Sequence, residues 1–199
     1  MKITRLILIR HGLTHWNKSG RYCGCKDVSL SKEGKAQAKR LSNFLKGAKF
    51  DKIYSSDRKR ALQTARIIFK KAKIFKVPLL REINFGAIEG LRHKEILRKY
   101  PVIYRNWIKD PYKTCLPEAE PMNAFKKRVG LGIGKIVRLN PGKELAIVCH
   151  GGVISILIGS ILKKRDFWRY VPKSASLTVV EYKNGLPKIR KFNETKHLE

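Results

Sequence analysis

Two histidines occupy equivalent places in the sequence, each directly after a short apolar run and directly before a glycine. His11 follows the run 5–9 and Arg10, and His150 follows the run 145–149. In open α/β sheets ligands bind beyond the carboxyl ends of the strands, so both imidazoles should point into one crevice. Imidazole is a nucleophile, and a neighbouring glycine lets a ligand approach the backbone. One such histidine would more often be structural, but the repeated pattern favours a catalytic site.

Arginines accompany these histidines. Arg10 precedes His11 and supplies a planar guanidinium suited to phosphate. The segment 55–65 contains Arg60, follows another apolar run and opens a predicted helix, which places cations and free backbone N–H groups at a helix N-terminus. Such a terminus is a ready anion site, although this segment alone fits a basic surface helix equally well. These residues point to an anionic, phosphate-like ligand.

The elements that must position these residues alternate along the chain. Short apolar runs predict buried strands at 5–9, 51–55, 75–79 and 145–149. Apolar residues at helical spacing predict helices at about 31–45, 57–71, 93–100, 125–139 and 153–162. Asn184-Gly185 predicts a hairpin joining strands 176–182 and 186–192. The sequence therefore predicts an α/β fold: a three-layer α/β/α sandwich whose sheet is mostly parallel and ends in a hairpin.

Length and composition limit the remaining possibilities. The 199 residues suit a single domain, predicted over 1–197, with 198–199 treated as a candidate cloning scar. Prolines 111, 117 and 121 mark an irregular, lid-like excursion at about 86–121. No apolar run reaches the roughly 20 residues of a membrane span, and we expect no membrane partner. Four cysteines are too few for a disulfide scaffold, so a cytoplasmic location is expected.

The chain is strongly basic, with 45 Lys plus Arg against 15 Asp plus Glu and a formal net charge of +30. Such a charge is compatible with nucleic-acid binding or with a general attraction for anions. However, the basic residues form only short clusters, and no segment matches a nucleic-acid-binding motif. We expect mostly solvated surface and no specific nucleic-acid partner.

Five blocks, in order, resemble the histidine phosphatase superfamily, whose members are phosphoglycerate mutase-like proteins. The blocks are Arg10-His11-Gly12 with Trp16-Asn17, Leu30–Ala38, Ser55–Ala65, Leu80–Gly90 and Val148–Ile154. Together they extend over about residues 3–182. The compact stretch between the fourth and fifth blocks resembles alpha-ribazole phosphatase and the broad-specificity phosphatases rather than the longer mutases. The resemblance implies a phosphatase.

The resemblance also implies a role for individual residues. His11 would attack phosphorus and form a phosphohistidine, and Glu82 would protonate the leaving oxygen and later deprotonate water. Three residues would surround the phosphoryl oxygens: Arg10, Arg60 and His150. Four further residues would bind the substrate: Asn17, Cys23, Gly24 and Gly151. This scheme needs no metal or cofactor, and the pair Cys23-x-Cys25 lacks a partner pair at metal-ligand spacing.

Several alternatives stay open at this point. The chain could be a phosphoglycerate mutase, or a non-catalytic relative that binds phosphoryl groups or nucleic acid. The segment 117–121 replaces the Gly-Gly-Glu-Ser block of many relatives, and Ser155 replaces an arginine, which affects substrate specificity. The three aromatic residues Tyr104, Trp107 and Tyr112 either line the substrate wall or, as we favour, pack the excursion. The expected substrate is a small phosphorylated metabolite, and a homodimer is compatible with the sequence.

Overall fold

The computed structural model describes residues 2–199 and contains one six-stranded sheet. Its strands are β1 (Ile3–Arg10), β2 (Lys52–Ser55), β3 (Ile74–Lys76), β4 (Glu144–Cys149), β5 (Leu177–Lys183) and β6 (Leu186–Glu194). They lie in the order β3-β2-β4-β1-β5-β6. The first four strands of this order are parallel, and the hairpin β5–β6 is antiparallel. The predicted sheet and hairpin are confirmed.

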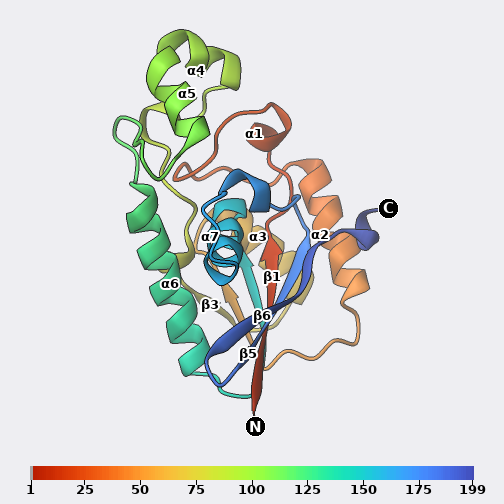
Figure 1. The fold of residues 1–199 in the computed structure, drawn as a ribbon. Coiled ribbons are helices and arrows are strands. Elements are labelled where there is room, and N and C mark those ends of the chain that lie inside the picture. Colours follow the sequence, from red (N-terminus) through yellow and green to blue (C-terminus); the bar gives the residue numbers. More distant parts are fainter. Residues whose placement is uncertain (1) are drawn as a thin grey trace.

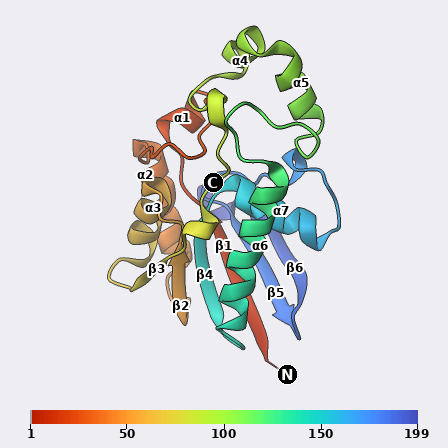
Figure 2. The same cartoon turned by 90° about the vertical axis from the view of Figure 1, so that its left-hand side faces the viewer.

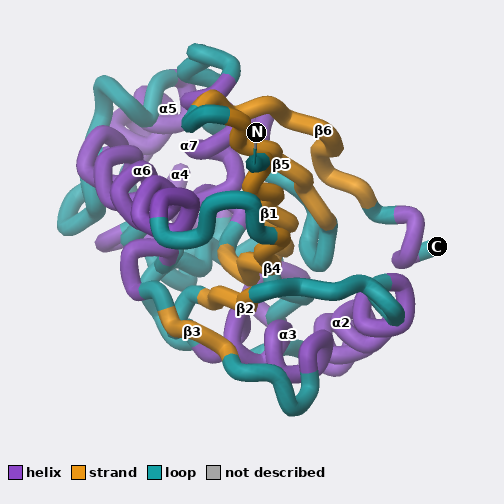
Figure 3. Tube along the Cα trace, turned by 90° about the horizontal axis from the view of Figure 1, so that it is seen from below, coloured by secondary structure: helices purple, strands orange, loops and turns teal. Residues whose placement is uncertain are grey.

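Helices cover both faces of the sheet. They are α1 (His15–Lys18), α2 (Lys32–Phe44), α3 (Lys59–Phe69), α4 (His93–Lys99), α5 (Pro101–Lys109), α6 (Met122–Arg138) and α7 (Gly151–Ile161). Helices α2 and α3 lie on one face, and α6 and α7 lie on the other (Figures 1 and 3). The side chain of Ser31 caps α2 by accepting the N–H of Gly34 at 3.0 Å. The three-layer α/β/α prediction is confirmed.

The central strands β1 and β4 contain continuous apolar runs because both of their faces are buried there. In β1, Leu6 and Leu8 belong to the core under α6 and α7. The alternate residues Ile7 and Ile9 belong to the core under α2 and α3. Each such side chain contributes about 1.5–3 kcal/mol when it is fully buried. This burial holds the carboxyl ends of β1 and β4 in a fixed position.

Some predicted boundaries were wrong, although the predicted end of the helix before Pro101 is confirmed. The third strand ends at Lys76 rather than residue 79, because Pro78 begins a 3-10 turn over Pro78–Leu80. Pro101 ends α4 but also starts the unpredicted helix α5, where its missing N–H costs nothing. Helix α7 begins at Gly151 rather than residue 153, so its first turn follows His150 directly.

The excursion at about 86–121 contains α4, α5 and a long loop. Figure 2 shows α4 and α5 standing beyond the carboxyl ends of the parallel strands. A lid function stays a prediction, as does the single-domain boundary at residue 197. Within residues 2–199, no helix combines the length and apolar character needed to cross a bilayer.

Candidate active site

The two predicted histidines lie side by side at the carboxyl ends of the two central strands. Strands β1 and β4 are parallel neighbours, with Arg10 opposite Cys149, so His11 and His150 take the next positions along their strands. The backbone N–H of His11 donates to the carbonyl of Cys149 at 3.0 Å. The two imidazole rings lie edge to face, with centroids 5.2 Å apart and an angle of 66° between their planes.

The hydrogen bonds of His11 define its tautomer. Its Nδ1 lies 2.8 Å from the carbonyl oxygen of Gly12, which can only accept, so Nδ1 carries the proton. Its Nε2 therefore keeps the lone pair and accepts the Nε–H of Arg60 at 3.2 Å. Burial, together with the nearby charges of Arg60 and Arg10, lowers the pKa of His11 well below 6.5. His11 is thus neutral, with Nε2 as its nucleophilic atom.

Arg60 is fully buried and held by backbone carbonyls. It donates to the carbonyl oxygens of Lys26 at 2.9 Å, Gly24 at 2.7 Å and Cys23 at 3.3 Å. The loop 23–26 therefore fixes the arginine that faces His11. The carbonyls of Cys23 and Gly24 hold Arg60, and the expected contact of these two residues with the substrate stays a prediction.

Arg10 approaches the same place from β1. Its Nη1 donates to the carbonyl of Pro172, and its Nε is buried without a hydrogen-bond partner among residues 2–199. Burial is the main cause of the lowered pKa of Arg10. An unpartnered buried N–H is unfavourable unless a ligand satisfies it, so this atom is suited to a phosphoryl oxygen.

Glu82 carries the protonatable carboxyl group of the site. Its carboxylate oxygens accept the backbone N–H groups of Ile83 at 3.0 Å and Gly152 at 2.9 Å. Burial nevertheless raises the pKa of Glu82, more than these donors and the nearby arginines lower it. A carboxyl group with a raised pKa can donate a proton to a leaving oxygen near neutral pH.

His150 is the N-cap residue of α7 and directly precedes Gly151. Its Nε2 lies 2.8 Å from the hydroxyl oxygen of Ser56, and its Nδ1 is buried without a partner in the described chain. Burial lowers the pKa of His150 well below 6.5. Sequence reasoning assigned no role to Ser56, although its place directly after β2 was a usable signal.

The glycines after the histidines serve the protein's own packing. A Cβ on Gly12 would lie 2.5 Å from the carbonyl oxygen of Gly34 in α2. A Cβ on Gly152 would lie 2.3 Å from Oε1 of Glu82. The expectation that Gly12 leaves room for a ligand was therefore wrong, because α2 occupies that room.

A cavity of about 150 Å³ opens beside these groups. It is lined by Arg10, Asn17, Arg21, Tyr22, Cys23, Glu82, Phe85, Gly151, Gly152, Phe167, Trp168 and Val171. His11, Arg60 and His150 are buried and are not themselves part of this lining, although Arg60 donates to the carbonyl of Cys23, which is. Asn17 lines the cavity, but its side chain also caps α1 by accepting the Thr14 N–H at 3.2 Å.

The aromatic residues that line the cavity are not the three that the sequence analysis considered. Tyr104 and Trp107 are buried in the core, and the ring of Trp107 packs at 4.9 Å on Trp168. Tyr112 packs instead against the guanidinium of Arg165. The packing alternative is confirmed for Tyr104 and Trp107, and the aromatic residues of the cavity are Tyr22, Phe85, Phe167 and Trp168.

Glu89 is a further residue that sequence reasoning missed. Its carboxylate accepts the backbone N–H groups of Gly24 at 3.1 Å, Cys25 at 2.7 Å and Phe85 at 3.1 Å. It thereby ties the loop that holds Arg60 to the segment after Glu82. The N–H of Gly24 is thus already used.

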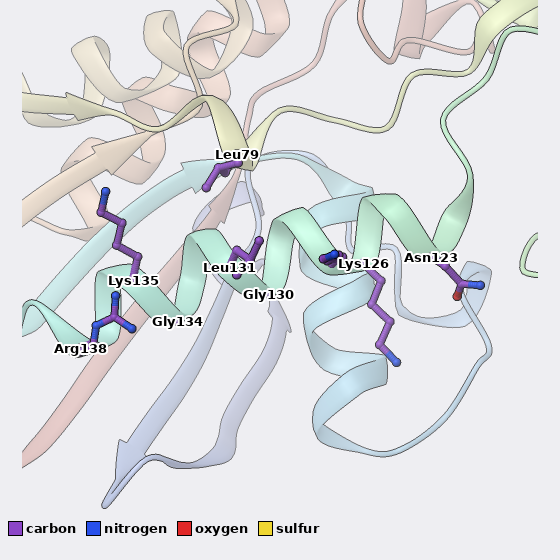
Figure 4. A pocket seen from close by; sticks show the side chains of 9 residues that line it. Leu79, Asn123, Lys126, Gly130, Leu131, Gly134, Lys135 and Arg138 are labelled. Atoms are coloured by element: carbon purple, nitrogen blue, oxygen red, sulfur yellow. The ribbon is translucent and has the colours of Figure 1, made fainter.

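A larger hollow of about 680 Å³ runs along the exposed face of α6 (Figure 4). It is lined by Leu79, Asn123, Lys126, Lys127, Gly130, Leu131, Gly134, Lys135 and Arg138. None of these is a predicted site residue, so the smaller cavity is the candidate active site.

Known proteins resemble this chain over nearly its whole length. Residues 6–195 match the model of the histidine phosphatase superfamily, branch 1. Phosphoserine phosphatase 1 of Hydrogenobacter thermophilus is 32% identical, with 98% of this chain and 95% of that protein covered. Adenosylcobalamin/alpha-ribazole phosphatase of Salmonella typhimurium is 29% identical, with 95% of this chain and 96% of that protein covered.

Two further matches bear on the reaction. The 2,3-bisphosphoglycerate-dependent phosphoglycerate mutase of Buchnera aphidicola is 40% identical, with 96% of this chain and 84% of that protein covered. A solved structure of phosphoserine phosphatase from Entamoeba histolytica, in complex with 3-phosphoglyceric acid, has a TM-score of 0.88 to this chain. The two sequences are 30% identical, and the match covers 98% of this chain and 100% of that one. The chain therefore belongs to the histidine phosphatase superfamily.

Proposed function

We propose that this chain hydrolyses phosphomonoesters through a phosphohistidine formed on His11, without a metal ion. The observation that carries the proposal is the neutral His11, whose Nδ1–H is held by Gly12 and whose Nε2 bears the lone pair. A buried Glu82 carboxyl with a raised pKa adjoins the same cavity. A nucleophile and a proton donor in these states are the two groups that the first step of the reaction needs.

In the first step, Nε2 of His11 attacks phosphorus and the bond to the leaving oxygen breaks. The Glu82 carboxyl gives its proton to that oxygen, and the product alcohol departs. The Nε–H of Arg60 must turn from Nε2 to a phosphoryl oxygen as the lone pair is used. At an effective dielectric near 20, each cation about 4 Å from a phosphoryl charge contributes about 4 kcal/mol before desolvation. Arg10 and Arg60 supply this stabilisation.

In the second step, water replaces the departed alcohol. The Glu82 carboxylate removes a proton from this water as its oxygen attacks phosphorus. The bond between phosphorus and Nε2 breaks, inorganic phosphate leaves, and His11 recovers its lone pair while Nδ1 stays protonated. Dividing hydrolysis into two displacements lets the same carboxyl group act first as acid and then as base.

The cavity suits the phosphoryl group of a small metabolite. Its volume is about 150 Å³, and its outer wall combines the aromatic rings of Tyr22, Phe85 and Trp168 with the cation Arg21. Related proteins are named phosphoserine phosphatase and adenosylcobalamin/alpha-ribazole phosphatase. These names support a small phosphorylated substrate for this chain.

A phosphoglycerate mutase is the second candidate, favoured by the 40% identity to the Buchnera aphidicola enzyme. A mutase would return the phosphoryl group from His11 to a second hydroxyl of the substrate rather than to water. The two activities differ in their products. Incubation with 3-phosphoglycerate should release phosphate if the chain is a phosphatase, and should give 2-phosphoglycerate without release if it is a mutase.

The direct test is hydrolysis of an aryl phosphate in the presence of a chelator. We expect sustained turnover by the native chain, loss of turnover in His11→Ala and full turnover in His15→Ala. His15 is an exposed histidine on α1 and controls for loss of an imidazole. Turnover that the chelator abolishes, or full activity in His11→Ala, would overturn the proposal.

A further inference from the structure

The segment that carries Glu82 is anchored from outside the cavity. Glu82 follows the 3-10 turn Pro78–Leu80 and belongs to no strand, so its backbone lacks the support of the sheet. Arg128, on α6, supplies that support. Its Nη1 donates to the carbonyls of Leu79 at 2.9 Å and Arg81 at 2.7 Å, and its Nη2 donates to the carbonyl of Glu82 at 2.9 Å.

A carboxylate fixes Arg128 in turn. Glu120 forms a bidentate ion pair with it: Nε of Arg128 donates to Oε1 of Glu120 at 2.6 Å, and Nη2 donates to Oε2 at 2.8 Å. The side chains of Arg128 and Glu120 are only 22% and 19% exposed, so the pair is shielded from competing water. Two parallel charge-assisted hydrogen bonds fix the guanidinium plane as well as its position.

Glu120 also contacts the chain just after Glu82. Its backbone N–H donates to the carbonyl of Asn84 at 2.9 Å, and its carboxylate lies 3.4 Å from the N–H of Asn84. The Arg128–Glu120 pair therefore contacts the chain both before and after Glu82. Helix α6 also packs closely on this segment, since a Cβ on Gly132 would lie 3.0 Å from Cβ of Leu79.

We propose that Arg128, held by Glu120, is a positioning residue that fixes the backbone of Glu82 so that its carboxyl group meets the leaving oxygen. Arg128 does not line the cavity, and its hydrogen bonds reach the site through the backbone of Glu82. Its charge also contributes, as the smallest cause, to the lowered pKa of His150. The inference rests on the proposed function, in which Glu82 is the proton donor. Only a reaction that needs that proton should suffer when Arg128 is changed.

Leaving-group dependence separates this role from a general structural one. An aryl phosphate with a strongly acidic phenol departs with little need of a proton, whereas an alkyl phosphate needs one. In Arg128→Met we expect kcat/KM for the alkyl phosphate, which reports the first step alone, to fall about 10-fold or more, a part of the 10²–10⁴-fold contribution of general acid catalysis. We expect kcat/KM for the activated aryl phosphate to fall less than about 3-fold, because the second step, in which Glu82 acts as base, does not enter this constant.

Three further variants complete the experiment. Glu120→Gln should show the same selective loss, Arg128→Lys should show less of it because the charge remains, and Lys127→Met should behave as the native chain. Lys127 is the exposed neighbour of Arg128 on α6. The ratio of the two kcat/KM values does not depend on the fraction of folded enzyme, so partial unfolding does not mask the result.

Equal losses for both substrates in Arg128→Met, or no loss for either, would overturn the inference. Glu82→Gln is measured in parallel. If it shows selective loss and Arg128→Met does not, only the positioning role is wrong. If Glu82→Gln itself shows no leaving-group dependence, the proton-donor role fails and the inference fails with it.

Discussion

Replacing Gly152 with alanine should displace the proposed proton donor while leaving the backbone of α7 intact. The added Cβ would lie 2.3 Å from Oε1 and 3.1 Å from Cδ of Glu82, whereas ordinary van der Waals contact begins near 3.4 Å. The carboxyl group must therefore retreat by roughly 1 Å. Alanine keeps the N–H that donates to Glu82, so the perturbation is steric. A misplacement of about 1 Å costs on the order of 100-fold in rate.

Stability should change much less than activity. Alanine in a helix is favoured over glycine by up to about 1 kcal/mol. This gain partly offsets an overpacking cost of about 1–3 kcal/mol beside Glu82. We expect kcat for an alkyl phosphate to fall about 100-fold, while the urea midpoint shifts only slightly.

Gly130→Ala is the matched control, because nothing lies within 4 Å of a Cβ at that exposed position of α6. It should raise the unfolding free energy and leave kcat unchanged. Native kcat in a folded Gly152→Ala variant would refute the reasoning, because Glu82 would then not need its observed position.

Three other predictions follow from the contacts of the site. The pH profile of kcat/KM should be bell-shaped: activity falls at low pH as His11, whose pKa is lowered, gains a proton, and at high pH as Glu82, whose pKa is raised, loses one. The alkaline limb should vanish in Glu82→Gln, and its persistence would assign that limb to another group. Ser56→Ala removes the 2.8 Å contact to His150 and should lower the free energy of unfolding by about 1–3 kcal/mol in urea; an unchanged midpoint would show that the ring finds another partner. Gly12→Ala forces a Cβ to 2.5 Å from a backbone oxygen of α2 and should cost about 1–3 kcal/mol of stability in the same assay. A Gly12→Ala variant as stable as the native chain would contradict the close packing of α2.

The sequence predicted the parts of the structure that depend on local patterns. Continuous apolar runs identified β1 and β4 because both faces of these strands are buried. Asn184-Gly185 identified the hairpin because both residues adopt a positive φ there, 53° and 78°. The convergence of His11 and His150 followed from the parallel arrangement of their strands.

Residues that act through long-range contacts could not be predicted in this way. Glu89 holds the N–H of Gly24, 65 positions away, and Arg128 holds the carbonyl of Glu82, 46 positions away. A single charged residue has no periodicity that reveals such a partner. Pro101 correctly marked the end of α4, but helix α5, which begins at this proline, was not predicted, because proline is unfavourable inside a helix but well suited to its first turn.

Covalent catalysis by His11 can be tested by trapping the phosphoenzyme. Glu82→Gln lacks the base for the second step, so an activated aryl phosphate should phosphorylate it faster than water can remove the group. After rapid quenching in alkali, peptide mass spectrometry should find one added phosphoryl group on the peptide containing His11. The group should be stable in alkali, lost in acid, and absent from Glu82→Gln that also carries His11→Ala. A phosphoryl group on another residue, or its retention without His11, would contradict the account.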